Sequence, residues 1–306
     1  MLPAYCGERH WRLVFMTAII QYTLSGLVIG GLYAIVALGF YIMWAAVRAV
    51  NFAHGDTLML GSVLAVVLMW SGVPLLLGIP LAIAASALFG MIIERVAVRP
   101  LNHGPSSIGW MLSTIAIGLM LEAFVTVTFG ADPRSLPSPL MQTPIPFGGA
   151  GIFPHELLVP VVAIVLLASL DWFYRSTMTG RAMRALAQNP VAAGLMGIDV
   201  RKMALISFAA ASALGAFAGI LAAPIIQVSA AMGLLLGLKG FLVAIIAGMS
   251  NARGIVIVGF AYGVLERFIE GFGNTSLREV LGFGAMILLL LLFPNGLFGR
   301  REVKKV

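Results

Sequence analysis

Polar residues that could bind a small solute cluster at two places in an otherwise apolar chain. The stretch 50–56, VNFAHGD, offers an amide in Asn51, an imidazole in His54 and a carboxylate in Asp56. A second interruption runs from Gln227 to Lys239 and brings an amide and an ammonium group. Together these side chains could hydrogen-bond or ion-pair with a polar ligand, while neither set has the spacing of a metal site.

The stretch 50–56 also has a purely structural interpretation, which stays open. Asp56 can cap the backbone N–H groups of a following helix, and Asn51 can satisfy carbonyls that end a preceding one. Gly55 would permit the turn between them. On this interpretation His54 serves a cytoplasmic turn, and on the other it contacts a substrate.

Motifs of enzymes are missing when sought one by one. His155 and Glu156 begin like a zinc-protease motif but lack the second histidine. Residues 233–240, GLLLGLKG, place the lysine at the wrong offset for a phosphate-binding loop, and no G-x-S-x-G elbow occurs. The single cysteine, Cys6, allows neither an internal disulfide nor a thiolate cluster. We therefore expect no enzymatic activity, no ATP hydrolysis by this chain alone, and no cofactor.

The composition predicts that these residues are positioned by membrane-spanning helices. The chain is 60% hydrophobic and 10% charged, against about 25% charged in an ordinary soluble domain. Apolar blocks of roughly 20 residues recur from residue 13 to residue 293. We expect an all-α, polytopic transmembrane bundle of eight to ten spans, forming one domain over residues 1–306 in contact with membrane lipid.

The placement of basic residues predicts the topology. The net charge of +7 comes from residues grouped between apolar blocks, which argues against a nucleic-acid partner. By the positive-inside rule, the basic segment 175–202 and the basic C-terminus are cytoplasmic, and the proline-rich loop 131–155 is periplasmic. The uncharged run 13–47 is too long for a cleaved signal, so we expect it to remain as the first membrane element.

Some helices are expected to be discontinuous. Residues 13–47 as one helix would span about 52 Å, against a hydrocarbon core of about 30 Å, so we expect a break at Gly30–Gly31. Since irregular backbone in a membrane must be buried or line water, a substrate path is expected beside 51–56 and 227–239. The predicted path residues are Asn51, His54, Gly55, Asp56, Gln227 and Lys239.

Glycine pairs four residues apart predict close helix contacts. We expect these contacts within one bundle and not at a dedicated dimer seam. The pairs are Gly26/Gly30, Gly215/Gly219, Gly233/Gly237 and Gly259/Gly263. The stretches GLYAIVALGF and ALGAFAGILA, each followed by a polar interruption, suggest an internal repeat.

Charged residues inside the apolar blocks are expected to pair with one another near the periplasmic ends of their helices. They are Glu122, Glu266, Arg267 and Glu270.

The segment 175–202 is predicted to contain an alanine-rich helix over 181–188 and, after Pro190, a short second helix ending at Gly197. Its apolar side chains would form a surface that needs a partner, unless the loop folds back on its own bundle. These side chains are Met183, Leu186, Leu195, Met196 and Ile198.

With these features the chain resembles the integral-membrane permeases of high-affinity branched-chain amino acid ABC importers. The resemblance lies in GGLYAIVALGF with VNFAHGD, in ERVAVRPL, in TGRAMRALAQNPVAAGLMGID, in GLKGFLVAIIAGMSNARGIVIVGFAYGVLE and in FPNGLFGRREVKKV. It implies an importer of the bacterial inner membrane with two related permeases, of which this looks like the shorter, two cytoplasmic ABC ATPase subunits and a periplasmic binding protein. Its cargo would be branched-chain or related amino acids, although family members also carry urea, short amides and aromatic or dicarboxylic compounds.

Such an importer needs ATP, and this chain has no phosphate-binding loop, so the energy must arrive through a cytoplasmic protein contact. We expect residues 180–199 to dock on an ATPase subunit. The residues expected to couple are Gly180, Arg181, Arg184, Ala185, Asn189, Gly197 and Ile198. The alternatives are a stand-alone secondary transporter or channel for a small polar solute and, third, an intramembrane enzyme.

Overall fold

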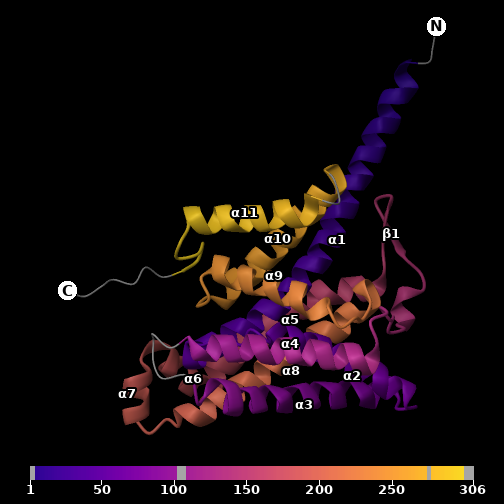
Figure 1. The fold of residues 1–306 in the computed structure, drawn as a ribbon. Coiled ribbons are helices and arrows are strands. Elements are labelled where there is room, and N and C mark those ends of the chain that lie inside the picture. The colour runs from indigo at the N-terminus through magenta and orange to yellow at the C-terminus, as the bar shows by residue number, and fades with distance from the viewer. Residues whose placement is uncertain (1–3, 102–107, 274–276, 300–306) are drawn as a thin grey trace.

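The computed structural model describes residues 4–101, 108–273 and 277–299, and these form a helical bundle (Figure 1). The long helices are α1 (Ala4–Val47), α2 (His54–Trp70), α3 (Leu75–Ile93), α4 (Gly109–Phe129), α5 (Pro154–Ser176), α8 (Val200–Ile226), α9 (Met232–Ala247), α10 (Ala252–Phe272) and α11 (Arg278–Leu292). Shorter helices are α6 (Met178–Gln188), α7 (Pro190–Leu195), the π-helix η1 (Glu94–Val98) and the 3-10 turn η2 (Pro139–Met141). Strands β1 (Ile145–Phe147) and β2 (Ala150–Ile152) pair antiparallel.

The helices have the length and composition of a membrane protein, which confirms the predicted all-α polytopic fold. Within the described residues, 5 helices are long and apolar enough to cross a membrane, namely α1, α3 with η1, α4, α5 and α8. Helices α2 and α9 are apolar but shorter, at 17 and 16 residues. Many large apolar side chains on α3, α4, α5 and α11 face outward, as expected where lipid is the solvent.

The predicted break at Gly30–Gly31 is wrong, because α1 is continuous through both residues. A Cβ at Gly30 would meet the backbone of Gly259 and Phe260 on α10, so glycine serves close packing there and not a kink. The excess length is accommodated differently. Helix α1 crosses the bundle obliquely, and its N-terminal part extends beyond the other helices (Figure 1).

The four glycine pairs make contacts within the chain, as expected. Gly26 and Gly30 of α1 face Gly259 and Gly263 of α10, where added Cβ atoms would collide with backbone on both sides. Gly215 and Gly219 of α8 lie against the first turns of α2, and Gly233 and Gly237 of α9 lie against Gly55. Small residues therefore let these helices approach backbone to backbone.

Two short helices begin inside the bundle, so the helices are discontinuous at places other than Gly30. Helix α2 follows residues 48–53 and starts at His54, whose ring lies against Gly39 and Val36 near the C-terminal end of α1. Helix α9 follows residues 227–231, and its first turn meets the first turn of α2 at Gly233 and Gly55. The linker before α9 is anchored by reciprocal backbone hydrogen bonds between Val228 and Arg134, of 2.6 and 2.8 Å.

The two predicted loops lie at opposite ends of the bundle. The hairpin β1–β2, within 131–155, is at one end, and α6 and α7 are at the other, on the same side as the end of α11 (Figure 1). Which end faces the cytoplasm stays a prediction. The basic residues of 300–306 and the side chains of Arg9 and Arg12, whose charges support that prediction, lie outside the described part of the chain, as does the side chain of Cys6.

Candidate functional site

A cavity of about 230 Å³ lies where the first turns of α2 and α9 meet α1 and α4. Its walls are apolar and aromatic, apart from two carboxylates. The lining residues are Phe40, Phe52, Gly55, Asp56, Ile115, Gly118, Leu119, Glu122, Gly233, Leu234, Gly237, Leu238 and Phe241. Helix α4 contributes 115, 118, 119 and 122 from one face, and α9 contributes 233, 234, 237, 238 and 241 from one face, as helical periodicity requires.

Part of the cavity wall is bare backbone. An added Cβ at Gly55 would meet the backbone of Gly233 and Gly237, so α2 and α9 touch here without side chains between them. Gly55 lies inside α2 and has no left-handed backbone conformation. The predicted role of Gly55 in a turn is therefore wrong, and its role is close helix approach.

The two carboxylates come from different helices. Asp56 is only 6% exposed. Its Oδ2 occupies the space that a Cβ on Gly118 would need, and Glu122 follows Gly118 by one helical turn on α4. Among the described residues, the Asp56 carboxylate is hydrogen-bonded only to its own backbone. The Glu122 carboxylate has no hydrogen-bond or ion-pair partner among them. No basic side chain lines the described cavity.

Asp56 does not cap α2 in the way that the sequence suggested. The N-cap is Ala53, and no side-chain hydrogen bond caps this helix. The Oδ1 of Asn51 instead accepts a hydrogen bond from the N–H of Ala53 at 3.0 Å, and the backbone O of Asn51 accepts one from His54 at 3.1 Å. Asn51 thus closes the turn before α2, which leaves the Asp56 carboxylate free for the cavity.

Of the other predicted path residues, neither His54 nor Gln227 lines the cavity. His54 is fully buried, with Nε2 3.2 Å from the carbonyl oxygen of Val36 and its ring 4.7 Å from the ring of Phe40. Gln227 is exposed and ends α8 with a φ of 62°. His54 therefore supports the cavity wall through Phe40.

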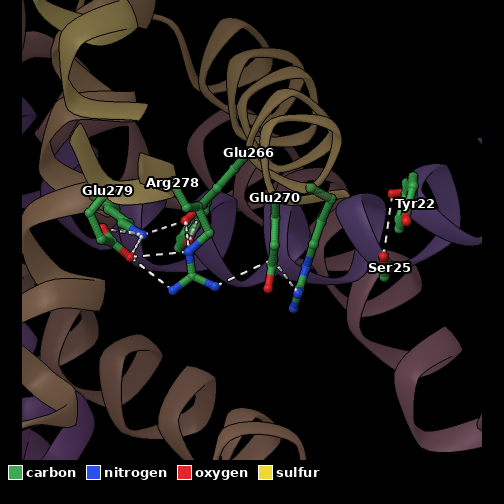
Figure 2. A network of polar contacts seen from close by, with 9 residues as sticks. Tyr22, Ser25, Glu266, Glu270, Arg278 and Glu279 are labelled. Atoms are coloured by element: carbon green, nitrogen blue, oxygen red, sulfur yellow. Dashed lines mark hydrogen bonds and ion pairs between the residues drawn. The ribbon is translucent and has the colours of Figure 1, made fainter. Parts of the chain in front are cut away.

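Lys239 belongs to a separate polar network on the opposite face of α9. Its Nζ lies 2.5 Å from Glu266 Oε1 and 2.9 Å from Glu279 Oε2. The hydroxyl of Tyr33 donates to Glu266 at 2.6 Å. Figure 2 shows Arg278 between Glu279 and Glu266 and linked also to Glu270.

This network confirms the expected pairing of Glu266, Arg267 and Glu270. Arg267 lies 2.7 Å from Glu270, so each carboxylate of the network has a cation within 3.4 Å. Glu122 departs from the expectation, because its carboxylate has no recorded cation among the described residues and it faces Asp56 instead.

At the other end of the molecule, α6 and α7 have well-defined helix ends. The side chains of Thr177, Asn189 and Asp199 cap α6, α7 and α8, and each accepts a hydrogen bond from a backbone N–H. The N–H of Lys202 lowers the pKa of the Asp199 carboxyl from its ordinary value. Gly197 has a φ of 84° and ends α7, with Ile198 N donating to Ala193 O and Gly197 N to Gly194 O.

The apolar surface of this segment is smaller than predicted. Met183 and Leu186 are 1% exposed and pack on the bundle, because α6 is amphipathic and turns these residues inward. Gly180 is buried against the backbone of Phe173 and Tyr174. The exposed apolar side chains are Met178, Val191, Leu195 and Met196.

The remaining predicted coupling residues lie on the same segment. Arg181 and Arg184 are exposed on α6, Ala185 and Ile198 are half-buried, and Asn189 is the exposed cap of α7. Helix α6 is joined to the end of α1 by a 2.9 Å hydrogen bond from Arg48 to the carbonyl oxygen of Ala187.

Sequence reasoning missed the part of the cavity that α4 supplies. Gly118 and Glu122 are four residues apart in an apolar block, and this spacing of a small and an acidic residue was the available signal. Their proximity to Asp56 depends on tertiary packing between helices far apart in the sequence.

Comparisons with known proteins give a consistent result. A family model described as the branched-chain amino acid transport system permease component matches residues 22–291. The chain is 30% identical over 302 residues to the high-affinity branched-chain amino acid transport system permease protein LivH of Escherichia coli K12, covering 94% of this chain and 97% of that protein. Identity is also 30% to BraD of Pseudomonas aeruginosa, covering 94% and 98%. The guanosine ABC transporter permease protein NupQ of Bacillus subtilis is 25% identical over 237 residues, 73% of each chain.

Proposed function

Since the chain belongs to the branched-chain amino acid transport permease family, we propose that it is a membrane permease subunit of an ATP-driven ABC importer. It carries branched-chain or related amino acids across the bacterial inner membrane. It works with a second, related permease, two cytoplasmic ABC ATPase subunits and a periplasmic binding protein. The whole chain, 1–306, acts as one permease domain.

The observation that carries this proposal is the cavity between two short helices. In transporters, short or interrupted hydrophobic helices in the two halves of a chain mark the substrate site. Here α2 and α9 are the shorter apolar helices, and their first turns meet at Gly55 and Gly233 beside the cavity. Of the predicted path residues, Gly55 and Asp56 lie at this place.

A second permease supplies the missing wall of the path. The rim of the cavity carries large apolar side chains that this chain leaves exposed, including Leu119 at 57% and Leu234 at 57%. A cavity with two carboxylates is unstable when it faces lipid, because each unsatisfied polar group in hydrocarbon costs roughly several kcal/mol of free energy. Covering by a related chain would keep the two carboxylates of the cavity away from lipid.

Helices α6 and α7 transmit the work of ATP hydrolysis. Val191, Leu195 and Met196 are 74–85% exposed at the end of the molecule that carries the basic segment 175–202, where water and not lipid is expected. Apolar surface in water favours a protein partner. The hydrogen bond from Arg48 to Ala187 and the buried Met183 and Leu186 attach this element to the bundle.

The experiment is purification of the chain with its neighbours under mild conditions, followed by uptake of radiolabelled leucine in proteoliposomes. We expect two ATPase subunits to co-purify, and uptake to require ATP and the binding protein. A chain that transports alone, driven by an ion gradient, would instead be a secondary transporter or channel.

The coupling step is tested by Leu195→Glu, which places a charge on the exposed apolar surface of α7. Leucine uptake and stimulated ATPase activity should fall at least about tenfold while the protein stays folded, because interface contacts of this kind contribute roughly 2 kcal/mol. Arg184→Glu should act in the same direction. Gly197→Trp is a weaker test, since the φ of 84° makes any side chain strained there. Uptake equal to wild type in both charge variants would contradict a coupling role.

The orientation follows the charge pattern. The end of the molecule that carries α6, α7 and the end of α11 is cytoplasmic, the C-terminus is cytoplasmic as well, and 131–155 is periplasmic. Alkaline phosphatase fused at Arg184 should be inactive, and green fluorescent protein fused to the C-terminus should be bright. The opposite pair of results would invert the topology.

A further inference from the structure

We propose that Asp56 and Glu122 form a subsite for the positively charged ammonium group of the transported solute. The cavity then selects molecules that carry an amine next to an apolar group. This inference rests on the proposed function, and it names the part of the solute that this chain recognises.

The charge of the cavity is unbalanced. Two carboxylates line it, and no lysine, arginine or histidine does so among the described residues. Elsewhere in the bundle, buried acids have partners, as Glu266 has in Lys239 and Glu94 has in Arg99. A pair of acids without a cation in a low-dielectric site is stabilised when a cation enters.

The position of Asp56 directs its charge to the cavity. Asp56 is only 6% exposed and lines the cavity, and among the described residues its carboxylate has no partner beyond its own backbone. Gly118 leaves the space into which Oδ2 projects, and any larger residue there would close it. Asn51 has already closed the turn before α2, so Asp56 is not needed as a cap.

The rest of the lining favours an organic ammonium over a metal cation. Mg²⁺ and Ca²⁺ take about six or more oxygen ligands, and two carboxylates among phenylalanine and leucine do not supply them. Phe40, Phe52 and Phe241 instead line the cavity with aromatic rings, a type of side chain that attracts an ammonium group. The aliphatic lining, Ile115, Leu119, Leu234 and Leu238, suits the apolar side chain of the same molecule.

The test measures charge selectivity at the cavity in the assembled transporter in nanodiscs. In a Cys6→Ala background, Leu119→Cys places one thiol in the lining, and Phe147→Cys places a control thiol on the exposed hairpin strand β1, away from the proposed ATPase contact. A cationic methanethiosulfonate, the ethyltrimethylammonium reagent, is compared with the anionic ethylsulfonate reagent. At Leu119→Cys, the labelling rate of the cationic reagent divided by that of the anionic reagent should exceed the same ratio at the control by about tenfold, because nearby carboxylates attract the cation.

Neutralisation should abolish this preference. Asp56→Asn with Glu122→Gln should bring the ratio at Leu119→Cys to that of the Phe147→Cys control, and Glu122→Gln alone should lower it. Leucine and 3-methylbutylamine, which share the ammonium group, should slow labelling, while 4-methylpentanoate, which lacks it, should not.

A ratio equal to the control in the parent protein, or one unchanged by neutralisation, would overturn the proposal. Equal protection by leucine and 4-methylpentanoate, or no protection by leucine, would do the same. Failure of the proposed function would give a different result, namely no ATP-dependent leucine uptake by the parent transporter. The labelling ratios can be measured in either case.

Discussion

The two faces of α9 differ in whether the acidic side chains near them are paired with cations. On one face, Lys239 is held between Glu266 and Glu279, and Arg278 completes the network (Figure 2). On the other face, Asp56 and Glu122 line a cavity to which no described residue contributes a basic side chain. A membrane protein gains nothing in stability from unpaired acids. The difference fits the proposed division between charges that hold helices together and charges that bind a ligand.

The largest expected effect is on stability, from Lys239→Met. Removing the only lysine of the network leaves Glu266 and Glu279 short of a cation, and breaking a buried pair costs about 3–5 kcal/mol. The melting temperature of the purified chain in nanodiscs should drop by several degrees. Lys202→Met is the matched control, because Lys202 is exposed and pairs only with exposed Asp199.

The double variant Lys239→Met/Glu266→Gln sharpens the comparison. It removes both charges of the closest pair and should recover part of the lost stability, since a pair replaced by neutral groups leaves no uncompensated charge. A single variant as stable as wild type would mean that the network does not hold α9 to α10.

A smaller effect on stability is expected for Gly118→Ala at the cavity. The new Cβ would meet Asp56 Oδ2, the end of a side chain that can rotate, so the cost should be about 1 kcal/mol. Leucine uptake should nevertheless fall severalfold, because the carboxylate is displaced. Gly284→Ala on α11, where a Cβ meets nothing within 4 Å, is the control and should keep both stability and uptake. Equal behaviour of the two variants would show that the space beside Asp56 is not needed.

The smallest effect is expected for Asp171→Asn. Asp171 pairs with Arg175 and Arg253 at 3.0 and 3.1 Å, yet both arginines are largely exposed. Exposed ion pairs contribute about 0–1 kcal/mol, so the melting temperature should shift little. A shift as large as that of Lys239→Met would contradict the view that burial decides the effect of a pair.

The sequence predicted the class of fold and the pairing of Glu266, Arg267 and Glu270 within the polar network. Apolar blocks and basic loops were sufficient for a helical membrane bundle, and the glycine pairs identified backbone contacts such as Gly30 with Gly259. Chain length could not distinguish a broken α1 from a long oblique one, because the outcome depends on α10 packing against Gly30. Of the polar interruption at 51–56, Gly55 and Asp56 line the cavity while Asn51 and His54 do not, and a substrate path there stays a prediction.

The assignment of individual side chains needed the tertiary structure. Lys239 was predicted on the substrate path because it interrupts an apolar block, but helical rotation turns it to the face opposite the cavity, toward Glu266. Glu122 of α4 was expected to form a structural ion pair, but it faces another acid, Asp56 of α2. Periodicity within one helix cannot reveal which residues of a distant helix face it.

The most direct measurement compares Asp56→Asn with Lys239→Met in the same assembled transporter, recording melting temperature and ATP-dependent leucine uptake for each. We expect Asp56→Asn to keep or slightly raise the melting temperature, because it neutralises an unpaired buried charge, and to lose most of the uptake. Lys239→Met should lower the melting temperature. An Asp56→Asn variant that melts as low as Lys239→Met, or one that transports leucine like wild type, would contradict the division between structural and ligand-binding charges.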